Sequence, residues 1–254
     1  MKMKSNIFSV ENKVVIVTGA ARGTGRAIAE GFLECGAIVY FFDLLKDVES
    51  IVELAKNSRA HSIVGDLRNK TDIYRLVSTV VEENGCIDVL INNAGVTFSS
   101  DDCYNEDVWD MTLEVNLKGA FLLSSKVGEI MKEQRRGSMI NITSLGAELG
   151  FPGNPSYVAS KGGLKQLGKA MAVDLSQYNI RVNNVCPGYF ITDMTRKSYS
   201  DPHLREARNK RIMLGRWGNP RDLVGPCIFL ASEAAAYITG IDLIVDGGWV
   251  AKGL

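Results

Sequence analysis

Short apolar runs alternate with longer segments of helical periodicity along most of the chain. Two of these runs, 14–17 and 38–42, are hydrophobic at both alternating positions, which is typical of strands that helices cover on both faces. Alternation of strands with helices is in turn typical of βαβ units and a parallel sheet. The pattern predicts about seven strands, at 14–18, 37–43, 61–66, 87–92, 137–143, 179–186 and 242–246.

The segments between these strands predict the helices. No linker, repeat or charge run divides the 254 residues, so we expect a single domain over 1–254. The fold class is then α/β, a doubly wound parallel sheet with helices on both faces. The long segment 187–219 has no clear period and predicts an irregular substrate lid. Helical periodicity spans 24–35, 47–57, 71–83, 105–134 and 155–178.

Composition and charge exclude several classes of protein. The chain is 46% hydrophobic and 23% charged, as ordinary globular proteins are, and its 29 basic residues balance 29 acidic ones. A chain without net charge has no global field that attracts nucleic acid, so we expect no such partner. No apolar run approaches the ~18 residues of a membrane helix, and Ser5, Asn6 and Glu11 interrupt any secretory signal. We therefore expect a cytoplasmic protein.

Cysteine and histidine offer no pattern for a metal or a disulfide framework. The cysteines are scattered, odd in number and never arranged as CxxC, which favours buried free thiols. His61 and His203 lie far apart and in no ligand spacing, so we expect no metal site. The five cysteines are Cys35, Cys86, Cys103, Cys186 and Cys227.

A glycine-rich turn joins the first predicted strand to the first helix. Gly19 permits a tight turn, and Gly23 and Gly25 leave no Cβ between the backbone and a pyrophosphate at the helix N-terminus. The spacing is GxxxGxG, but its place after the first strand favours a dinucleotide site of the Rossmann type. The turn comprises Thr18, Gly19, Arg22, Gly23, Thr24 and Gly25, with two alanines at 20–21.

Two charged residues bear on the choice of dinucleotide. Asp43 ends the second predicted strand, where a carboxylate accepts hydrogen bonds from the adenosine ribose and repels a 2′-phosphate. Arg22 has the opposite effect, because a guanidinium pairs with that phosphate. The repulsion should outweigh the gain from one loop arginine, so we expect NAD rather than NADP. A simple strand-end turn residue is the alternative interpretation of Asp43.

Ser144, Tyr157 and Lys161 form the candidate chemistry. Tyr157 and Lys161 are four residues apart in a helix that begins at Pro155, so both project from one face. Ser144 follows an apolar strand at its carboxyl end, where parallel sheets bind their ligands. A lone YxxxK is common by chance, but together with the glycine turn and the serine it predicts a reactive site.

With these motifs in this order, the chain resembles the short-chain dehydrogenase/reductase family over essentially its whole length. The resemblance implies that the adenine lies near Asp66 and Leu67, and the nicotinamide near Asn93, Pro187-Gly188 and Thr192. The motifs that carry it are Thr18-Gly19, Gly23 and Gly25, Asp66-Leu67, Asn92-Asn93-Ala94-Gly95, Asn116, Ser144, Tyr157, Lys161, Pro187-Gly188 and Thr192.

Hydride transfer to or from a carbon that bears oxygen requires an acid or base for the oxygen's proton, and Tyr157 is the candidate. Its ordinary pKa of about 10 must fall by ~2 to 3 units for work near neutrality, and the Lys161 ammonium and an oxidised nicotinamide could lower it. The resemblance also implies that Lys161 binds the nicotinamide ribose, that Ser144 steadies the substrate oxygen and that Asn116 holds a proton-relaying water. An ordinary polar helix residue is the alternative for Asn116.

The substrate is less determined. The segment 215–249 resembles the sugar-acid dehydrogenases of the family, those of gluconate and 2-deoxygluconate, which favours a sugar acid or polyol. Glu148, Asn154 and Arg196 could contact such a molecule, although loop surface residues are the alternative.

Two other functions remain open. A 3-oxoacyl-carrier-protein reductase using NADPH would meet its acidic partner through basic residues such as Arg135, Arg136 and those of 205–211. A non-catalytic dinucleotide sensor is the alternative of another class. For assembly, the resemblance implies a homotetramer formed through the two long helices and the C-terminal strand region.

Overall fold

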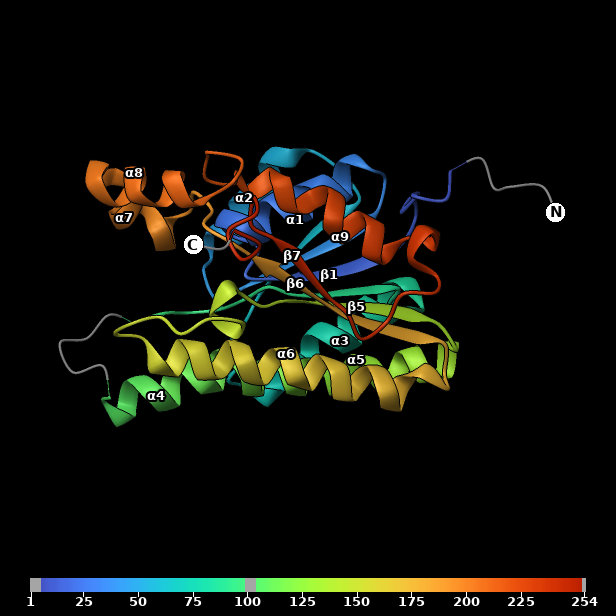
Figure 1. Ribbon diagram of the computed structural model, residues 1–254. Helices are drawn as coiled ribbons and strands as arrows, with labels where there is room; N and C mark the ends of the chain where they lie inside the picture. Colours follow the sequence, from blue (N-terminus) through green and yellow to red (C-terminus); the bar gives the residue numbers. More distant parts are fainter. Residues whose placement is uncertain (1–5, 99–103, 253–254) are drawn as a thin grey trace.

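The computed structural model describes residues 6–98 and 104–252. Within these ranges seven parallel strands form one sheet in the order β3-β2-β1-β4-β5-β6-β7 (Figure 1). The predicted parallel α/β fold is thereby confirmed. The strands are β1 (Val14–Thr18), β2 (Ile38–Asp43), β3 (Ala60–Val64), β4 (Val89–Asn92), β5 (Gly137–Ile142), β6 (Ile180–Pro187) and β7 (Asp242–Val245).

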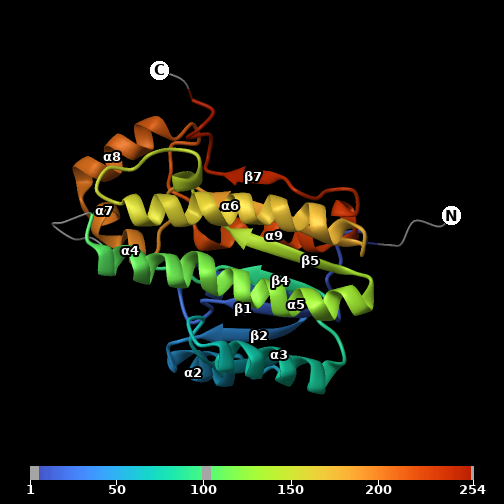
Figure 2. The same cartoon turned by 90° about the horizontal axis from the view of Figure 1, so that it is seen from below.

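Helices cover both faces of the sheet, as Figures 1 and 2 show. On one face lie α1 (Gly23–Glu34), α2 (Asp47–Ala55) and α9 (Val224–Ala231), and on the other α3 (Lys70–Asn84), α5 (Ala120–Gln134) and α6 (Pro155–Ser176). Because side chains alternate along a strand, Val15 and Val17 of β1 enter the core beneath α1, whereas Val14 and Ile16 enter the core beneath α3. All four are buried, which explains the uninterrupted apolar run.

The strand order reverses between β1 and β4, so the chain winds outward from the centre of the sheet in both directions. Ligands of such sheets bind beyond the carboxyl ends of the strands at this switch point. Three further helices lie beyond those ends (Figures 1 and 2). They are α4 (Glu106–Leu113), α7 (Arg196–Ser200) and α8 (Pro202–Arg211).

The prediction of an irregular segment over 187–219 is wrong, because α7 and α8 occupy much of it. Pro202 occupies the first turn of α8, and the Asp201 carboxylate caps the helix by accepting from the backbone N–H groups of His203 and Leu204, at 2.9 and 3.1 Å. No residue of α8 is buried, although Ile212, which follows its last residue, is. The helix therefore has no apolar period that a sequence pattern could reveal.

The single helix predicted over 105–134 is also wrong in part. A π-helical turn, Glu114–Gly119, separates α4 from α5 and contains Asn116. The Asn116 amide lies 2.7 Å from the backbone N of Val96 and 2.9 Å from its carbonyl oxygen, and it bonds to both. These long-range bonds hold Asn116 at the insertion, and such π-turns are frequent at functional sites.

Cysteine burial agrees with the prediction at only some positions. Cys186 and Cys227 are buried free thiols, whereas Cys86 is partly exposed and Cys35 is exposed. Cys103 lies outside the described residues. Across 6–98 and 104–252, no helix has both the length and the apolar character needed to cross a membrane.

Candidate active site

The glycine turn between β1 and α1 has the backbone that its sequence requires. Gly19 and Gly23 have φ of 67° and 57°, a region that residues with a Cβ rarely adopt. Gly25 is also required for packing within the turn, besides its predicted place beside a pyrophosphate. A Cβ there would lie 2.1 Å from the Gly19 carbonyl oxygen and 2.3 Å from Nδ2 of Asn93, so this glycine closes the turn on itself.

The N-terminus of α1 suits a phosphate group. Its N-cap residue, Arg22, is extended and gives the helix no side-chain cap, so the first N–H groups of α1 lack a side-chain acceptor. These N–H groups and the positive end of the helix dipole form an anion site beside the switch point. The exposed Arg22 side chain makes no ion pair with any described residue.

Asn93 joins the end of β4 to the glycine turn. Its Nδ2 donates to the Thr18 carbonyl at 2.9 Å, and its Oδ1 accepts from the Thr24 hydroxyl at 2.8 Å. The backbone N–H groups of Asn93 and Ala94 both donate to the Thr18 hydroxyl at 3.0 Å. The two turns that flank the switch point are therefore one hydrogen-bonded unit.

Asp43 holds two backbone amides. Its carboxylate accepts from Ala21 N at 2.8 Å and from Leu45 N at 2.9 Å, and thus ties the end of β2 to the glycine turn. Asp43 therefore makes the turn contacts that its alternative interpretation expects, and its charge also stands at this edge of the predicted cofactor site. The two backbone N–H bonds fix the position of the Asp43 carboxylate. A ribose hydroxyl bound by Asp43 would donate to the lone pairs that these bonds leave unused.

Asp66 and Leu67, the predicted adenine neighbours, follow β3. The Arg68 guanidinium lies 2.6 Å from the Asp66 carboxylate, and the hydrogen bonds between them lower the pKa of Asp66. Leu67 is buried and packs in the core beneath α3. A Cβ on Gly119 would lie 2.8 Å from Cβ of Leu67, so the π-helical turn packs against this loop.

Ser144, Tyr157 and Lys161 converge at the carboxyl end of β5. Tyr157 and Lys161 lie in the first two turns of α6, and the Lys161 Nζ is 5.9 Å from the centre of the Tyr157 ring. The Ser144 hydroxyl accepts from Gly146 N at 3.0 Å and also hydrogen-bonds to the Tyr157 phenol. A Cβ on Gly95 would lie 3.3 Å from the Lys161 Nζ, so the turn after β4 reaches this group.

Burial dominates the electrostatics of this group. It raises the pKa of Tyr157, and the hydrogen bond with Ser144 opposes that rise only in part. The net direction is therefore opposite to the fall in the Tyr157 pKa that proton transfer near neutrality requires. Burial lowers the pKa of Lys161 to about 8, and the Lys161 Nζ donates to the Ile142 carbonyl at 2.8 Å. Among the described residues, the Ile142 carbonyl is the one hydrogen-bond acceptor for the three N–H donors of this ammonium.

A family model described as enoyl-(acyl carrier protein) reductase matches residues 19–250. The chain belongs to the short-chain dehydrogenase/reductase family. It is therefore an NAD(P)-dependent enzyme. Among the motif residues that carry the resemblance, Thr18, Asn92 and Pro187 end strands β1, β4 and β6 of the dehydrogenase.

Individual relatives differ in what their names say they act on. The dehydrogenase is 37% identical to the 2-dehydro-3-deoxy-D-gluconate 5-dehydrogenase of Escherichia coli strain K12, across 96% of this chain and 98% of that one. It is 38% identical to a 3-oxoacyl-[acyl-carrier-protein] reductase of Thermotoga maritima, across 95% and 99%. A crystal structure of a gluconate 5-dehydrogenase from Burkholderia cenocepacia with NADP and tartrate has a TM-score of 0.92 at 31% identity, across 97% and 98%.

Asn116 is fully buried in the dehydrogenase, and its side chain is occupied. Besides its two bonds to Val96, its Nδ2 donates to the Ser160 hydroxyl at 3.0 Å. The side chain thus holds the end of the loop after Gly95 against α6. A proton-relaying water at this residue would have to use its backbone carbonyl.

Pro187 and Gly188 end β6, and Gly188 N donates to the Val245 carbonyl of β7 at 3.0 Å. Thr192 caps the short helix that precedes α7, and its side chain lies 3.7 Å from where a Cβ of Gly23 would stand. Thr192, one of the predicted nicotinamide neighbours, therefore lies beside the glycine turn, whereas a Cβ on Gly188 would meet Asp246.

Of the three suggested substrate contacts, Glu148 and Arg196 are paired as loop residues are, whereas the side-chain oxygen of Asn154 is enclosed without a partner. The Glu148 carboxylate is 2.5 Å from the Lys165 Nζ, and the Asn154 amide donates to the Thr97 hydroxyl at 2.6 Å. Arg196 is exposed and pairs with Asp193.

A row of hydrogen-bonded polar side chains that was not predicted from the sequence runs across four strands. Nδ2 of Asn92 donates to Asn141 at 2.9 Å, and Nδ2 of Asn141 donates to Asn184 at 3.0 Å. Nδ2 of Asn184 in turn donates to Asp242 at 2.8 Å. The four residues are paired in register on β4, β5, β6 and β7. Only the register of distant strands reveals this amide ladder, so no local sequence signal could have found it.

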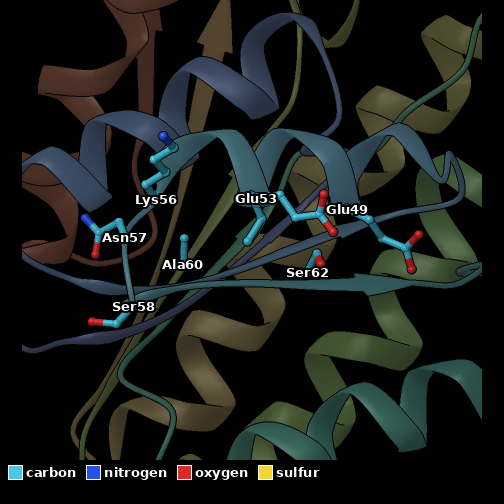
Figure 3. Close-up of a pocket in the computed structure, with 8 residues that line it drawn as sticks. Glu49, Glu53, Lys56, Asn57, Ser58, Ala60 and Ser62 are labelled. Atoms are coloured by element: carbon cyan, nitrogen blue, oxygen red, sulfur yellow. The ribbon is translucent and has the colours of Figure 1, made fainter.

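A shallow hollow of about 600 Å³ lies apart from all these residues, between α2 and the edge strand β3 (Figure 3). Glu49, Glu53, Lys56 and Ser62 are among the side chains that line it. None of the predicted site residues borders it.

Proposed function

We propose that this dehydrogenase interconverts a secondary alcohol and a ketone on a sugar acid, with NAD(H) as its cofactor and Tyr157 as the general acid and base. The observation that carries the proposal is the enclosed group of Ser144, Tyr157 and Lys161, which lies beside an open helix N-terminus at the switch point. A phenol that hydrogen-bonds to a hydroxyl, with a buried ammonium 5.9 Å from the centre of the phenol ring, is suited to proton transfer at one oxygen atom.

When bound, the nicotinamide supplies or accepts the hydride. The Tyr157 phenolate would take the proton of a substrate hydroxyl in oxidation, and the phenol so formed would return it to the oxygen in reduction, while the Ser144 hydroxyl hydrogen-bonds the same oxygen. Lys161 uses its unpartnered donors for ribose hydroxyls, and its charge stabilises the phenolate that burial disfavours. The backbone carbonyl of Asn116 positions the water through which the proton leaves.

Two observations support a sugar acid and NAD. The relatives from Escherichia coli and Burkholderia cenocepacia are named for gluconate derivatives, and the second holds tartrate, a hydroxy acid. The Asp43 carboxylate stands at the edge of the glycine turn, where it repels a 2′-phosphate. The Burkholderia cenocepacia structure contains NADP, so the choice between NAD and NADP is tested directly below.

The 3-oxoacyl-carrier-protein reductase is the second candidate. The Thermotoga maritima relative and the arginines of α8 favour it. Asp43 opposes it, because that activity is expected to use NADPH. The non-catalytic sensor has no support, since the side chains needed for proton transfer are assembled.

We also infer that the segment 187–219 closes over the substrate within a single domain of 1–254, that four chains assemble through α5, α6 and the β7 edge, and that the enzyme works in the cytoplasm. The free buried thiols of Cys186 and Cys227 are consistent with a reducing compartment.

The test is a panel of sugar acids, polyols, keto-uronates and acyl thioesters with NAD, NADP and their reduced forms, followed by nicotinamide absorbance. We expect turnover of a sugar acid with NAD. Tyr157→Phe should lower turnover about 10²- to 10⁴-fold and leave dinucleotide binding unchanged. Wild-type turnover in that variant, or activity confined to acyl thioesters, would refute the proposal.

A further inference from the structure

Four aromatic side chains cluster under α7 and α8. The ring of Tyr189 lies 5.2 Å from that of Trp217 and 4.7 Å from that of Trp249, and Tyr199 lies 5.2 Å from Trp217. We call Tyr189, Tyr199, Trp217 and Trp249 the lid cluster. Leu145, the neighbour of Ser144, packs into the same hydrophobic group, so the lid cluster adjoins the proposed reaction site.

Three arginines of α8 lie on the lid cluster. Arg205, Arg208 and Arg211 are spaced three residues apart, which places them on one side of the helix. Each guanidinium lies over an aromatic ring: Arg205 over Tyr199, Arg208 over Tyr189 and Trp217, and Arg211 over Trp249. The distance from the Arg208 guanidinium to the centre of the Tyr189 ring is 4.6 Å.

The carboxylates of this region are engaged elsewhere. Asp193 pairs with Arg196, Glu206 pairs with Lys210, and Asp201 caps α8. Within the described residues, none of the three α8 arginines on the lid cluster has a carboxylate partner. The segment 187–219 holds seven lysines and arginines against three acidic residues in a chain with no net charge, so its field attracts anions.

Buried polar atoms without partners mark the centre of this region. In the described chain, Nη1 of Arg208 and the indole nitrogens of Trp217 and Trp249 are enclosed donors that lack an acceptor. The side-chain oxygen of Asn209, the neighbour of Arg208, is an enclosed acceptor that lacks a donor. Proteins rarely leave buried donors unpaired, so these three donors around the lid cluster are suited to an anionic acceptor.

We propose that Arg208, with the indole N–H groups of Trp217 and Trp249, binds the carboxylate of the substrate, and that the Asn209 amide oxygen accepts from a substrate hydroxyl. This inference rests on the proposed function and names the subsite that selects an acid over a neutral polyol. Because the donors are enclosed beneath α8, the ligand enters when α8 lifts, and the helix then closes over it. A surface that docks an acidic carrier protein would instead present its arginine donors to solvent.

The first experiment measures binding, independently of turnover. D-gluconate and D-glucitol, which differ by the carboxylate, are titrated against the wild-type enzyme while tryptophan fluorescence is followed; two of the three tryptophans, Trp217 and Trp249, belong to the lid cluster. Arg208→Gln should weaken D-gluconate binding about 10- to 100-fold, since hydrogen bonds to charged groups contribute that much, and leave D-glucitol binding unchanged. Arg208→Lys keeps the charge without the planar fork and should lose less affinity.

Arg205→Gln is the matched control, because it removes the same charge from the same helix and has no unpaired buried donor. It should bind D-gluconate like the wild-type enzyme. Equal losses in Arg205→Gln and Arg208→Gln would show a long-range field or carrier docking and overturn the subsite. No D-gluconate binding by the wild-type enzyme, or unchanged binding in Arg208→Gln with a wild-type melting temperature, would overturn it too.

Turnover of D-gluconate with NAD then separates this subsite from the proposed function. Oxidation by the wild-type enzyme together with an unchanged KM in Arg208→Gln refutes the subsite and leaves the function intact. Selective D-gluconate binding through Arg208, without oxidation of any sugar acid in the panel, refutes the function and leaves the subsite intact.

Discussion

At the scale of single residues, Lys161 is costly to the fold. Its side chain is buried, with 4% of its surface exposed, and in the described chain its ammonium has one acceptor, the Ile142 carbonyl. Burial lowers its pKa from 10.5 to about 8. Below pH 8 both the folded and the unfolded chain carry the proton, so the folded state there bears the full cost of a buried charge. Between pH 8 and 10.5 the unfolded chain binds more protons, and the free energy of unfolding rises with pH.

Lys161→Met should therefore stabilise the protein at pH 7 while removing its activity. The expected gain in the free energy of unfolding is about 3 kcal/mol, the equivalent of the pKa difference. Urea titrations of both proteins at pH 7 and pH 9.5 measure it. The gain should shrink at the higher pH as the wild-type lysine loses its proton. A pH-independent gain would assign the effect to packing rather than to charge.

Asp43 allows a second test at this scale, of cofactor choice. Asp43→Asn keeps the shape of the side chain and one oxygen acceptor for Ala21 N or Leu45 N, but it removes the charge. The ratio of kcat/KM for NADP to that for NAD should rise about 10- to 100-fold, because a phosphate no longer meets a carboxylate. Arg22→Gln should change the ratio in the opposite direction. An unchanged ratio in Asp43→Asn would mean that Asp43 acts only in the turn.

Residues whose roles depend on local spacing could be predicted from the sequence. Tyr157 and Lys161 share a helical face because they are four residues apart, and a strand end places Ser144 before them. Roles set by distant partners could not. The packing of Gly25 depends on Asn93, and the direction of the Tyr157 pKa depends on burial that no spacing reveals.

At the scale of elements, α6 rests on the amide ladder. A Cβ on Gly168 would lie 2.4 Å from Oδ1 of Asn184 and 2.7 Å from Nδ2 of Asn141. Gly168→Ala should therefore lower the free energy of unfolding by about 1–3 kcal/mol through overpacking, although alanine favours helices. Gly162→Ala is the control on the same helix, where a Cβ meets nothing within 4 Å, and it should stabilise by about 0.5–1 kcal/mol. Calorimetric melting of both variants measures these changes. A Gly168→Ala variant more stable than the wild-type protein would show that the amide ladder can shift to make room for the methyl group.

Helices α8 and α9, which the sequence pattern did not predict, share one property, which is that their sequences carry no amphipathic pattern. Residues 202–211 of α8 are polar on nearly every side, and α9 is almost wholly apolar and contains Gly225 and Pro226. The π-helical turn was missed for another reason, since the bonds that hold it join Asn116 to Val96, twenty residues earlier in the chain. Strands β1 and β2 were clear because helices bury them on both faces.

At the scale of the whole molecule, the layered fold leaves apolar side chains outside its core. Val173 of α6 is 74% exposed, and α5 and α6 lie side by side on one face of the sheet (Figure 2). Ile244 stands partly exposed on β7, the last strand of the sheet. A neighbouring chain that packed on α5 and α6 would bury Val173, and one that packed on the β7 edge would bury Ile244.

We expect light scattering to give the mass of four chains, and Val173→Glu to reduce it to two chains or one, because a buried carboxylate without a partner opposes assembly. Leu54→Glu is the matched control. Leu54 is as exposed, at 78%, but lies on α2 across the sheet, so this variant should keep the wild-type mass. A monomeric wild-type enzyme would refute the assembly, and an unchanged mass in Val173→Glu would remove the α6 face from it. Equal dissociation by both variants would show general destabilisation instead of a specific contact.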